Sequence, residues 1–508
     1  MSRARWVSGL VVALLLLPPL PAGAQRAPVF VEPGHWTWDA IRRLSVAGLA
    51  PPAGDHALAP VTVGHALHVF SHAEDSARSA DRPFLGALAA GYRAMLELEG
   101  DTAGLVAASQ LRAGWTGVRG EARGGDGYLE VEDWEGAQVL PGVQRPAVAW
   151  RGHGYIRPWL AWSADAGYLA GDAVVRSAVV SAAAGPLDLW VGRRRLHYAI
   201  GRGGGTVVGG ARNETPDVAH RTTYTFQGIG AHVRDPFHFP GFLRFLGADR
   251  VEVAVGRMAR VGRVDRPWVA FGRLMGSPFT ERLTLGINRG AIFGGDGIPI
   301  TPGRLAGLII GLHGGEGGEF ENQVFSTLVA FRPPLGVGVP LEFYVEWGMD
   351  DTAGAVRDVP AIVAGLDLAA VPGLPTMALA VERTSYAESC CGNPIWYRHI
   401  FYRGSWADEG RLFAHPLGGH GTEWLAHVRV DRPDDGLMFR VDGFRRDRGH
   451  ENLFAPDRTG RSLGGSVAAE LQVAGGTRMR LDGAWERGKE WDDVRAAIFL
   501  LHTFDLRR

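Results

Sequence analysis

The spacing of apolar residues changes once along the chain. Over residues 33–100, apolar side chains recur every three or four positions, as on one face of a helix. The pattern predicts three short helices, near 36–47, 63–70 and 83–96, and Gly48 ends the first of them. Three such helices can bury their apolar faces against one another, so we expect a small N-terminal helical bundle.

After about residue 104 the period becomes two and stays so to the end of the chain. Stretches such as 251–255, 341–347 and 377–382 alternate apolar and polar residues, which predicts strands. The polar positions of several strands are charged, as at Glu342 and Glu346. These strands therefore have one apolar face and one ionic face.

Two all-β folds accommodate such strands. A soluble sandwich turns the ionic face to bulk water, whereas a wide transmembrane barrel turns it to the lumen and gives the apolar face to lipid. The pattern alone does not separate them, but the number and continuity of the strands favour an antiparallel transmembrane barrel. Strands of about 9 to 11 residues with their connections give about 16 to 20 strands, and closure of a bacterial barrel requires an even number.

The first residues predict export. Arg3 and Arg5 precede an apolar run over 7–17, and the small residues 22–24 follow. This order is typical of a secretory signal peptide cleaved after Ala24, because the run is too short to span a bilayer as a helix. We therefore expect a signal peptide (1–24), a periplasmic helical bundle (25–104) and a β-barrel (105–508) in the outer membrane of a Gram-negative-type bacterium.

Charge and cysteine content exclude several classes of partner. The 53 basic and 54 acidic residues give a net charge of -1, and no basic tract with interleaved aromatic residues indicates nucleic acid. The two cysteines, Cys390 and Cys391, are adjacent, which allows a vicinal disulfide but neither a disulfide framework nor zinc spacing.

Metal and cofactor chemistry have weak support in the sequence. His65, His68 and His72 share one helix face with a spacing that a metal could use. No carboxylate accompanies them, so we interpret them as solvated or packing residues. We predict no metal and no cofactor.

Catalysis is not indicated either. The sequence has no G-x-S-x-G motif, and the acidic pair Asp350 and Asp351 lies in a loop where solvation is the simpler interpretation. We predict a protein that is not an enzyme.

The stretch 35–49, with Trp36 and Trp38, resembles the opening of an S-layer-homology-like module. Such modules bind cell-wall polymers, so the resemblance implies contact between the bundle and peptidoglycan. The alternative, which we favour, is that these aromatic residues form the core of the bundle.

Most of the mature chain resembles the Wzi family of capsule-assembly outer-membrane proteins. The motifs that carry the resemblance lie at 188–192, 197–203, 243–257, 396–404 and 415–418. The family implies an eighteen-stranded barrel that is closed by its own loops and plugged on the periplasmic side by the bundle. It also implies a surface lectin that binds exported capsular polysaccharide. We expect a monomer that contacts outer-membrane lipid and lipopolysaccharide. The alternative function is a porin-like channel for small solutes or sugars.

A lectin needs aromatic faces for sugar rings and charged groups for hydroxyls and uronate carboxylates. One short stretch supplies both kinds: Trp396, Tyr397, Arg398, His399, Tyr402 and Arg403. Arg193 and Arg195 form a second candidate, because a guanidinium binds a carboxylate through two hydrogen bonds. Aromatic girdles, luminal ion pairs and contacts to lipid phosphates are the alternative interpretations.

Overall fold

The computed structural model describes residues 26–33, 35–51, 61–80, 82–99, 105–119, 144–169, 172–209, 225–233, 250–258, 260–261, 264–310, 320–334, 339–350, 360–387, 396–397, 402, 406–408, 411–450 and 458–504. The predicted signal peptide and the two cysteines lie outside these residues.

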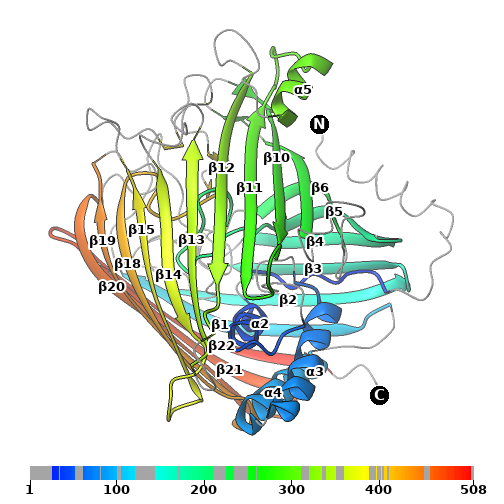
Figure 1. The fold of residues 1–508 in the computed structure, drawn as a ribbon, viewed down its shortest axis with the longest axis vertical. Coiled ribbons are helices and arrows are strands. Elements are labelled where there is room, and N and C mark those ends of the chain that lie inside the picture. The colour runs from blue at the N-terminus through cyan, green and yellow to red at the C-terminus, as the bar shows by residue number, and fades with distance from the viewer. Residues whose placement is uncertain are drawn as a thin grey trace.

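A single antiparallel sheet of 18 strands forms the body of the protein. The sheet closes into a barrel because β1 pairs with β2 on one side and with the last strand, β22, on the other. Figure 1 shows the strands around the lumen. The prediction of an antiparallel barrel with an N-terminal group of helices is confirmed, and the strand number is the one that the family resemblance implies.

The barrel strands are β1 (Ala108–Arg119), β2 (Gln144–Arg157), β3 (Leu160–Leu169), β4 (Asp172–Ala184), β5 (Leu187–Arg195), β6 (Thr225–Val233), β7 (Arg250–Arg257), β10 (Trp268–Gly276), β11 (Leu283–Phe293), β12 (Glu321–Phe331), β13 (Leu341–Asp350), β14 (Ala361–Leu368), β15 (Met377–Tyr386), β18 (Gly421–Arg432), β19 (Leu437–Arg448), β20 (Gly460–Ala474), β21 (Thr477–Arg487) and β22 (Asp492–Phe504). Two short hairpins, β8 (Arg260–Val261) with β9 (Val264–Asp265) and β16 (Ala407–Asp408) with β17 (Arg411–Leu412), lie outside the sheet.

The two faces of the wall differ as the alternation predicts. In β13, Glu342 and Glu346 are buried in the lumen, whereas Phe343 and Trp347 are 46% and 37% exposed on the outside. A sandwich would bury its apolar face and expose its charges, so this arrangement is that of a barrel in lipid.

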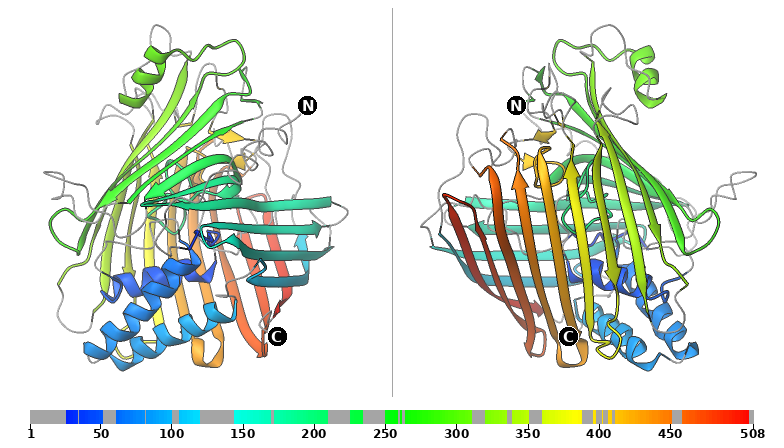
Figure 2. Two further views of the ribbon diagram at one scale, coloured as in Figure 1. Left: turned by 90° about the vertical axis from the view of Figure 1, so that its right-hand side faces the viewer. Right: turned by 60° about the vertical axis from the view of Figure 1, so that its left-hand side comes forward.

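The two ends of the barrel differ in their connections. At the end that holds the N-terminal helices, which we call the helix end, β4–β5 and β20–β21 are joined by tight turns in which Gly185 and Gly476 adopt positive φ angles of 62° and 72°. The four longest connections, 120–143, 196–224, 294–320 and 387–420, all leave strands at the opposite end, which we call the loop end. The views in Figure 2 show the helices and α5 (Pro302–Ile310) at opposite ends.

Three N-terminal helices are present: α2 (Trp36–Val46), α3 (Val63–Ser79) and α4 (Pro83–Leu98). The Thr62 side chain caps α3 by accepting a hydrogen bond from the backbone of His65. Our prediction ended the second helix at residue 70 and was wrong, because Ala73 and Ala77 continue its buried face. None of the helices in the described ranges is long and apolar enough to cross a membrane.

The helices share one core with the barrel wall. Trp36 and Trp38 are buried, and the apolar cluster around them includes Ala161 and Met438 from strands. Every residue of α2 is buried. The burial of both tryptophans supports the packing interpretation of the 35–49 motif. It leaves peptidoglycan contact untested.

Candidate functional site

The connection after β5 turns into the lumen. Residues 196–209, which we call the luminal segment, are all buried. The backbone N–H groups of Arg202 and Gly203 donate to the carboxylate of Glu382 on β15, at 2.6 and 2.8 Å. A Cβ atom at Gly203 would lie 2.8 Å from that carboxylate, so the glycine permits the close approach. Glu346 on β13 accepts two further hydrogen bonds from Thr206.

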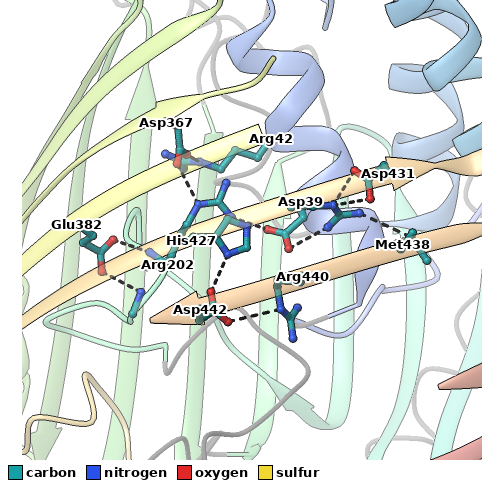
Figure 3. A network of polar contacts seen from close by, with 12 residues as sticks. Asp39, Arg42, Arg202, Asp367, Glu382, His427, Asp431, Met438, Arg440 and Asp442 are labelled. Carbon is teal, nitrogen blue, oxygen red and sulfur yellow. Dashed lines mark hydrogen bonds and ion pairs between the residues drawn. The ribbon is translucent and has the colours of Figure 1, made fainter. Parts of the chain in front are cut away.

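Ion pairs join α2 to the wall and to the luminal segment (Figure 3). Arg42 of α2 forms a salt bridge with Glu342 at 2.9 Å, pairs with Asp367, and donates to the backbone carbonyl of Ile200 at 3.1 Å. Arg42 is 0% exposed. One guanidinium thus holds a helix, two strands and the luminal segment together.

Asp39, one turn earlier on α2, receives two guanidinium groups. Arg202 donates to one of its oxygens at 3.1 Å and Arg429 of β18 to the other at 3.0 Å. Burial alone would raise the pKa of Asp39, but the two arginines outweigh burial and hold the pKa below its usual range. The carboxylate therefore stays ionised and keeps both contacts near neutral pH.

Arg43, the neighbour of Arg42, fixes α2 to other strands. It donates to Asp431 of β18 at 2.8 Å and to the carbonyls of Ala369 and Pro375 at 2.8 and 2.7 Å. All these partners lie in the wall or its turns at the helix end. The helix is therefore a fixed part of the barrel interior.

Part of the connection between β15 and β18 closes the lumen at the loop end. We call its described residues, 396–397, 402, 406–408 and 411–417, the mouth segment. The Tyr397 hydroxyl donates to the carbonyl of Thr206 at 2.8 Å, and the Trp406 indole donates to the carbonyl of Val207 at 2.6 Å. The mouth segment thus rests directly on the luminal segment, so α2, the luminal segment and the mouth segment fill the lumen at three successive levels.

The three predicted aromatic site residues lie inside this filling. Trp396, Tyr397 and Tyr402 are each 0% exposed. The Tyr402 hydroxyl donates to the carbonyls of Gly294 and Phe320 at 3.0 and 2.9 Å. Their burial favours packing over sugar contact for these three side chains. Arg398, His399 and Arg403 lie outside the described residues, and sugar contact by them stays a prediction.

The second predicted pair, Arg193 and Arg195, is half-buried at the end of β5. The backbone N–H of Arg195 donates to Glu32 at 3.4 Å. Arg194, between them, is buried with its guanidinium 3.9 Å from the ring centre of Phe30. Arg193 and Arg195 lie on β5 in the wall, whereas Trp396 and Tyr397 lie in the mouth segment. Ligand binding by Arg193 and Arg195 also stays a prediction.

Another aromatic and basic group lies at the loop end and was not predicted. Trp491, at the start of β22, is half-buried, and the guanidinium groups of Arg458 and Arg448 lie 5.1 and 5.7 Å from its ring centre. Glu486 binds Arg448 at 2.7 Å and Asp493 binds Arg458 at 3.3 Å. We call these five residues the Trp491 group. Strand pairing brings Arg448 and Arg458, from the end of β19 and the connection that follows it, beside the β21–β22 turn that carries Trp491.

At the helix end, His35 connects α2 to α4. Its Nε2 lies 2.9 Å from Glu99, and its Nδ1 accepts from the Thr37 hydroxyl at 2.8 Å. Burial lowers the pKa of His35 and outweighs the opposite effect of Glu99. The ring is therefore neutral near pH 7, with its proton on Nε2.

We expect acid to loosen this contact. The unfolded chain binds a proton at His35 near pH 6.5, whereas the folded ring binds one only at lower pH, so stability falls as the pH drops below that value. The protection factors of the α4 amides, which correct the exchange rates for their intrinsic dependence on pH, should therefore fall between pH 7.5 and about 5. His35→Gln, which keeps a neutral donor toward Glu99, should show a smaller fall. An equal loss of protection in both proteins would contradict the assignment to His35.

Comparison with known proteins supports the fold and identifies a family. The family described as capsule assembly protein Wzi matches residues 225–496, more than half of the chain. Wzi of Escherichia coli, described as an outer membrane protein involved in group 1 capsule assembly and a carbohydrate-binding β-barrel, is similar in structure, with a TM-score of 0.71 and 16% identity over 94% of this chain and 100% of that chain.

Two Pseudomonas aeruginosa proteins are less similar. OpdQ has a TM-score of 0.43 and 13% identity over 79% of this chain and 98% of its own, and OprD has a TM-score of 0.43 and 11% identity over 81% and 98%. No curated protein sequence matches the chain.

Proposed function

This chain belongs to the Wzi family of capsule assembly proteins, and on that premise we propose that it binds capsular or related polysaccharide at the cell surface and helps to assemble or retain it there, without catalysis. It is an outer-membrane β-barrel. Lipid faces its apolar outward side chains, such as Phe343 and Trp347.

Its orientation follows from the connections. Barrels of the outer membrane have short periplasmic turns and long external loops. The loop end therefore faces the outside and the helix end the periplasm, with the bundle (25–104) below the barrel (105–508). We also propose that residues 1–24 are a cleaved signal peptide and that the protein is a monomer. The exposed faces of α3 and α4 are the surfaces of the bundle available for contact with peptidoglycan.

The observation that carries the proposal is the filled lumen. Transport of solutes needs a water-filled path, but Arg42, Arg202 and Tyr397 are each buried in contacts that cross the lumen. A polysaccharide can then be bound at the loop end, where it is exported, and does not need to pass through the barrel. This favours a binding function over the porin-like alternative.

We place the binding surface around the Trp491 group. Trp491 is partly exposed at the loop end, and Arg448 and Arg458, held by Glu486 and Asp493, fix the orientation of its ring. Arg448 and Arg458 are each 1% exposed, so they orient the ring from below and do not contact a ligand themselves. The partly exposed ring of Trp491 suits stacking against the apolar face of a sugar ring. Arg398, His399 and Arg403, which follow Trp396 and Tyr397 in the same external connection, are proposed as further contacts.

The test is binding of the detergent-solubilised protein to capsular polysaccharide purified from its own organism. We expect saturable binding without release of saccharide fragments, and Trp491→Ala should weaken it by about fivefold, a factor that corresponds to the loss of one aromatic contact. Trp424→Ala is the matched control, because Trp424 is 52% exposed on the outward face of β18.

The outcomes separate the function from the site. Failure of the folded wild-type protein to bind would contradict the proposed function. Binding by Trp491→Ala as tight as by wild type would leave the function in place and reject the Trp491 group as its site.

A further inference from the structure

The helix α5 lies on the outside of the barrel wall. Leu308 of α5 packs in an apolar cluster with Ala291 and Phe293 of β11 and with Phe320. Ile292, between the two β11 residues, belongs to the separate cluster inside the lumen, so Ala291 and Phe293 point outward. Figure 2 shows α5 beyond the strands at the loop end.

An outward-facing arginine fixes the C-terminal end of α5. Arg289 of β11 donates to the carbonyl of Ile309 at 2.8 Å, and also to the carbonyl of Leu308 and to Gln323. Carbonyls at a helix C-terminus lack partners within the helix and carry a partial negative charge, so a cation there is stabilising. These hydrogen bonds satisfy the Arg289 guanidinium on the outward face of β11, which lipid would otherwise cover.

This contact also sets the direction of α5. Arg289 lies four positions before Phe293, about 13 Å along β11. With the usual strand tilt of about 40°, this places it about 10 Å nearer the membrane centre. Phe293 pairs across the sheet with Trp268, and Trp268 pairs with Arg257 at the same height. The C-terminal end of α5 therefore points toward the membrane.

The outer surface of α5 is apolar. Ile309 is 68% exposed and Leu305 is 39% exposed. Exposure of these apolar side chains to water is unfavourable, whereas contact with lipid is not. On the adjacent wall, Ile287 is 41% exposed. Exposed apolar side chains thus lie on α5 and on the wall below it, where acyl chains can cover them.

Arginines lie directly above this surface. Arg257 and Arg266 both reach Asp296, at 3.5 and 2.5 Å, and are 43% and 60% exposed. Arg304, on α5, lies over the ring of Phe320 at 5.4 Å and donates to a backbone carbonyl. Among the described residues no carboxylate pairs with Arg304.

Among the residues that the structure describes here, the charges do not cancel. Two carboxylates, Asp296 and Asp265, face the guanidinium groups of Arg257, Arg266 and Arg304. The buried Glu321, which pairs with Phe293 across the sheet, is balanced by Arg289. The excess is positive and exposed. It lies immediately above an apolar face, which is where the phosphate of a lipid headgroup sits when its acyl chains are in the outer leaflet.

We propose that α5 and the arginines Arg257, Arg266 and Arg304 form a binding site for a phosphate-bearing lipid of the outer leaflet. Guanidinium groups bind the phosphate oxygens through paired hydrogen bonds, and Leu305, Ile309 and the wall bind the acyl chains. The site requires the loop end to face outward, as in the proposed function, but it does not require polysaccharide binding.

The probe for this site is diphosphorylated lipid A, added to the full-length protein in detergent micelles and followed by native mass spectrometry. The variant R257Q/R266Q/R304Q should bind it about a hundredfold more weakly, because each arginine near a charged lipid surface contributes about fivefold. The control R119Q/R432Q/R461Q removes three other exposed arginines, which are 74%, 60% and 75% exposed, and should stay within about twofold of wild type.

Two further arms separate the sources of binding. Lipid A stripped of both phosphates should bind the wild type as weakly as intact lipid A binds the triple variant. The variant L305N/I309N should no longer bind intact lipid A, while its heat-modifiable gel mobility shows that the barrel is still folded. Equal binding of intact and dephosphorylated lipid would overturn the proposal. So would equal binding by the triple variant and wild type, or displacement of the lipid by millimolar inorganic phosphate, which would indicate a plain anion site. Polysaccharide binding by the triple variant should remain intact, so failure here is distinguishable from failure of the proposed function.

Discussion

Arg42→Met should destabilise the barrel by about 3 to 5 kcal/mol, the range measured when one partner of a buried ion pair is removed. The substitution keeps much of the side-chain volume but leaves Glu342 and Asp367 without the guanidinium that neutralises them. Arg332 lies 4.0 Å from Glu342 and Arg202 2.9 Å from Asp367, so part of the loss is compensated. Denaturant unfolding in detergent, with limited proteolysis of the α2–α4 region, measures the effect.

The matched control is Arg78→Met on α3. Arg78 is 72% exposed and pairs only at the surface, so its loss should change the free energy of unfolding by less than about 0.5 kcal/mol. The triple variant R42M/E342Q/D367N should recover part of the loss, since it removes the unpaired charges. Equal stabilities of Arg42→Met and Arg78→Met would show that α2 is held by its apolar core alone.

The barrel could be predicted from the sequence because it depends on a local rule. Alternation places Phe343 outside and Glu342 inside without knowledge of any partner strand. The N-terminal helices follow from an equally local rule. Their place in the barrel does not, because Asp39 finds its partners at Arg202 and Arg429, far along the chain.

The family resemblance implies a barrel closed by its own loops, but the local pattern does not identify the luminal segment as one of them. A glycine-rich stretch at 201–205 predicts an external turn, yet its glycines allow the backbone to approach Glu382. One signal was present: Val207 and Val208, fully buried, continue a stretch that an external loop would fill with polar residues. Glu346 on β13 and Glu382 on β15 both point into the lumen and are buried, so each needs hydrogen-bond donors, which the luminal segment supplies.

The aromatic residues at 396–402 show what residue type alone leaves open. Trp396 and Tyr402 suit a sugar-binding loop as well as a packed interior, and only the contacts with the luminal segment and with Phe320 decide between the two. The helix α5 was missed because it is only nine residues long and lies between glycine-rich stretches. Conversely, Trp491 became a candidate only through its position beside Arg448 and Arg458.

Removal of the luminal segment should convert a closed barrel into a conducting one. Replacement of residues 197–208 by a short Gly-Ser linker deletes Arg202 and Thr206 and leaves β5 and β6 joined. The mouth segment then loses the carbonyls that bind Tyr397 and Trp406. Glu346 loses the two donors of Thr206, and Glu382 keeps only the Tyr344 hydroxyl. The other two levels are loosened as well, because Arg42 of α2 loses the Ile200 carbonyl and Tyr397 of the mouth segment loses the Thr206 carbonyl. Water and ions can then pass the vacated layer and the loosened levels. Single-channel recordings in planar bilayers should therefore show discrete steps for the variant and none for the wild type.

The uncovered carboxylates also predict the sign of selectivity. Glu346 and Glu382 would face the new path after the deletion removes the Arg202 cation, so the reversal potential in a salt gradient should indicate preference for cations. An equally long deletion within the β1–β2 connection (120–143) is the control and should leave the barrel silent. Steps of equal size in the wild-type protein would show that the filling of the lumen opens spontaneously. The porin-like function would then be preferred to polysaccharide binding, because a barrel that conducts ions without any change has an open path for solutes.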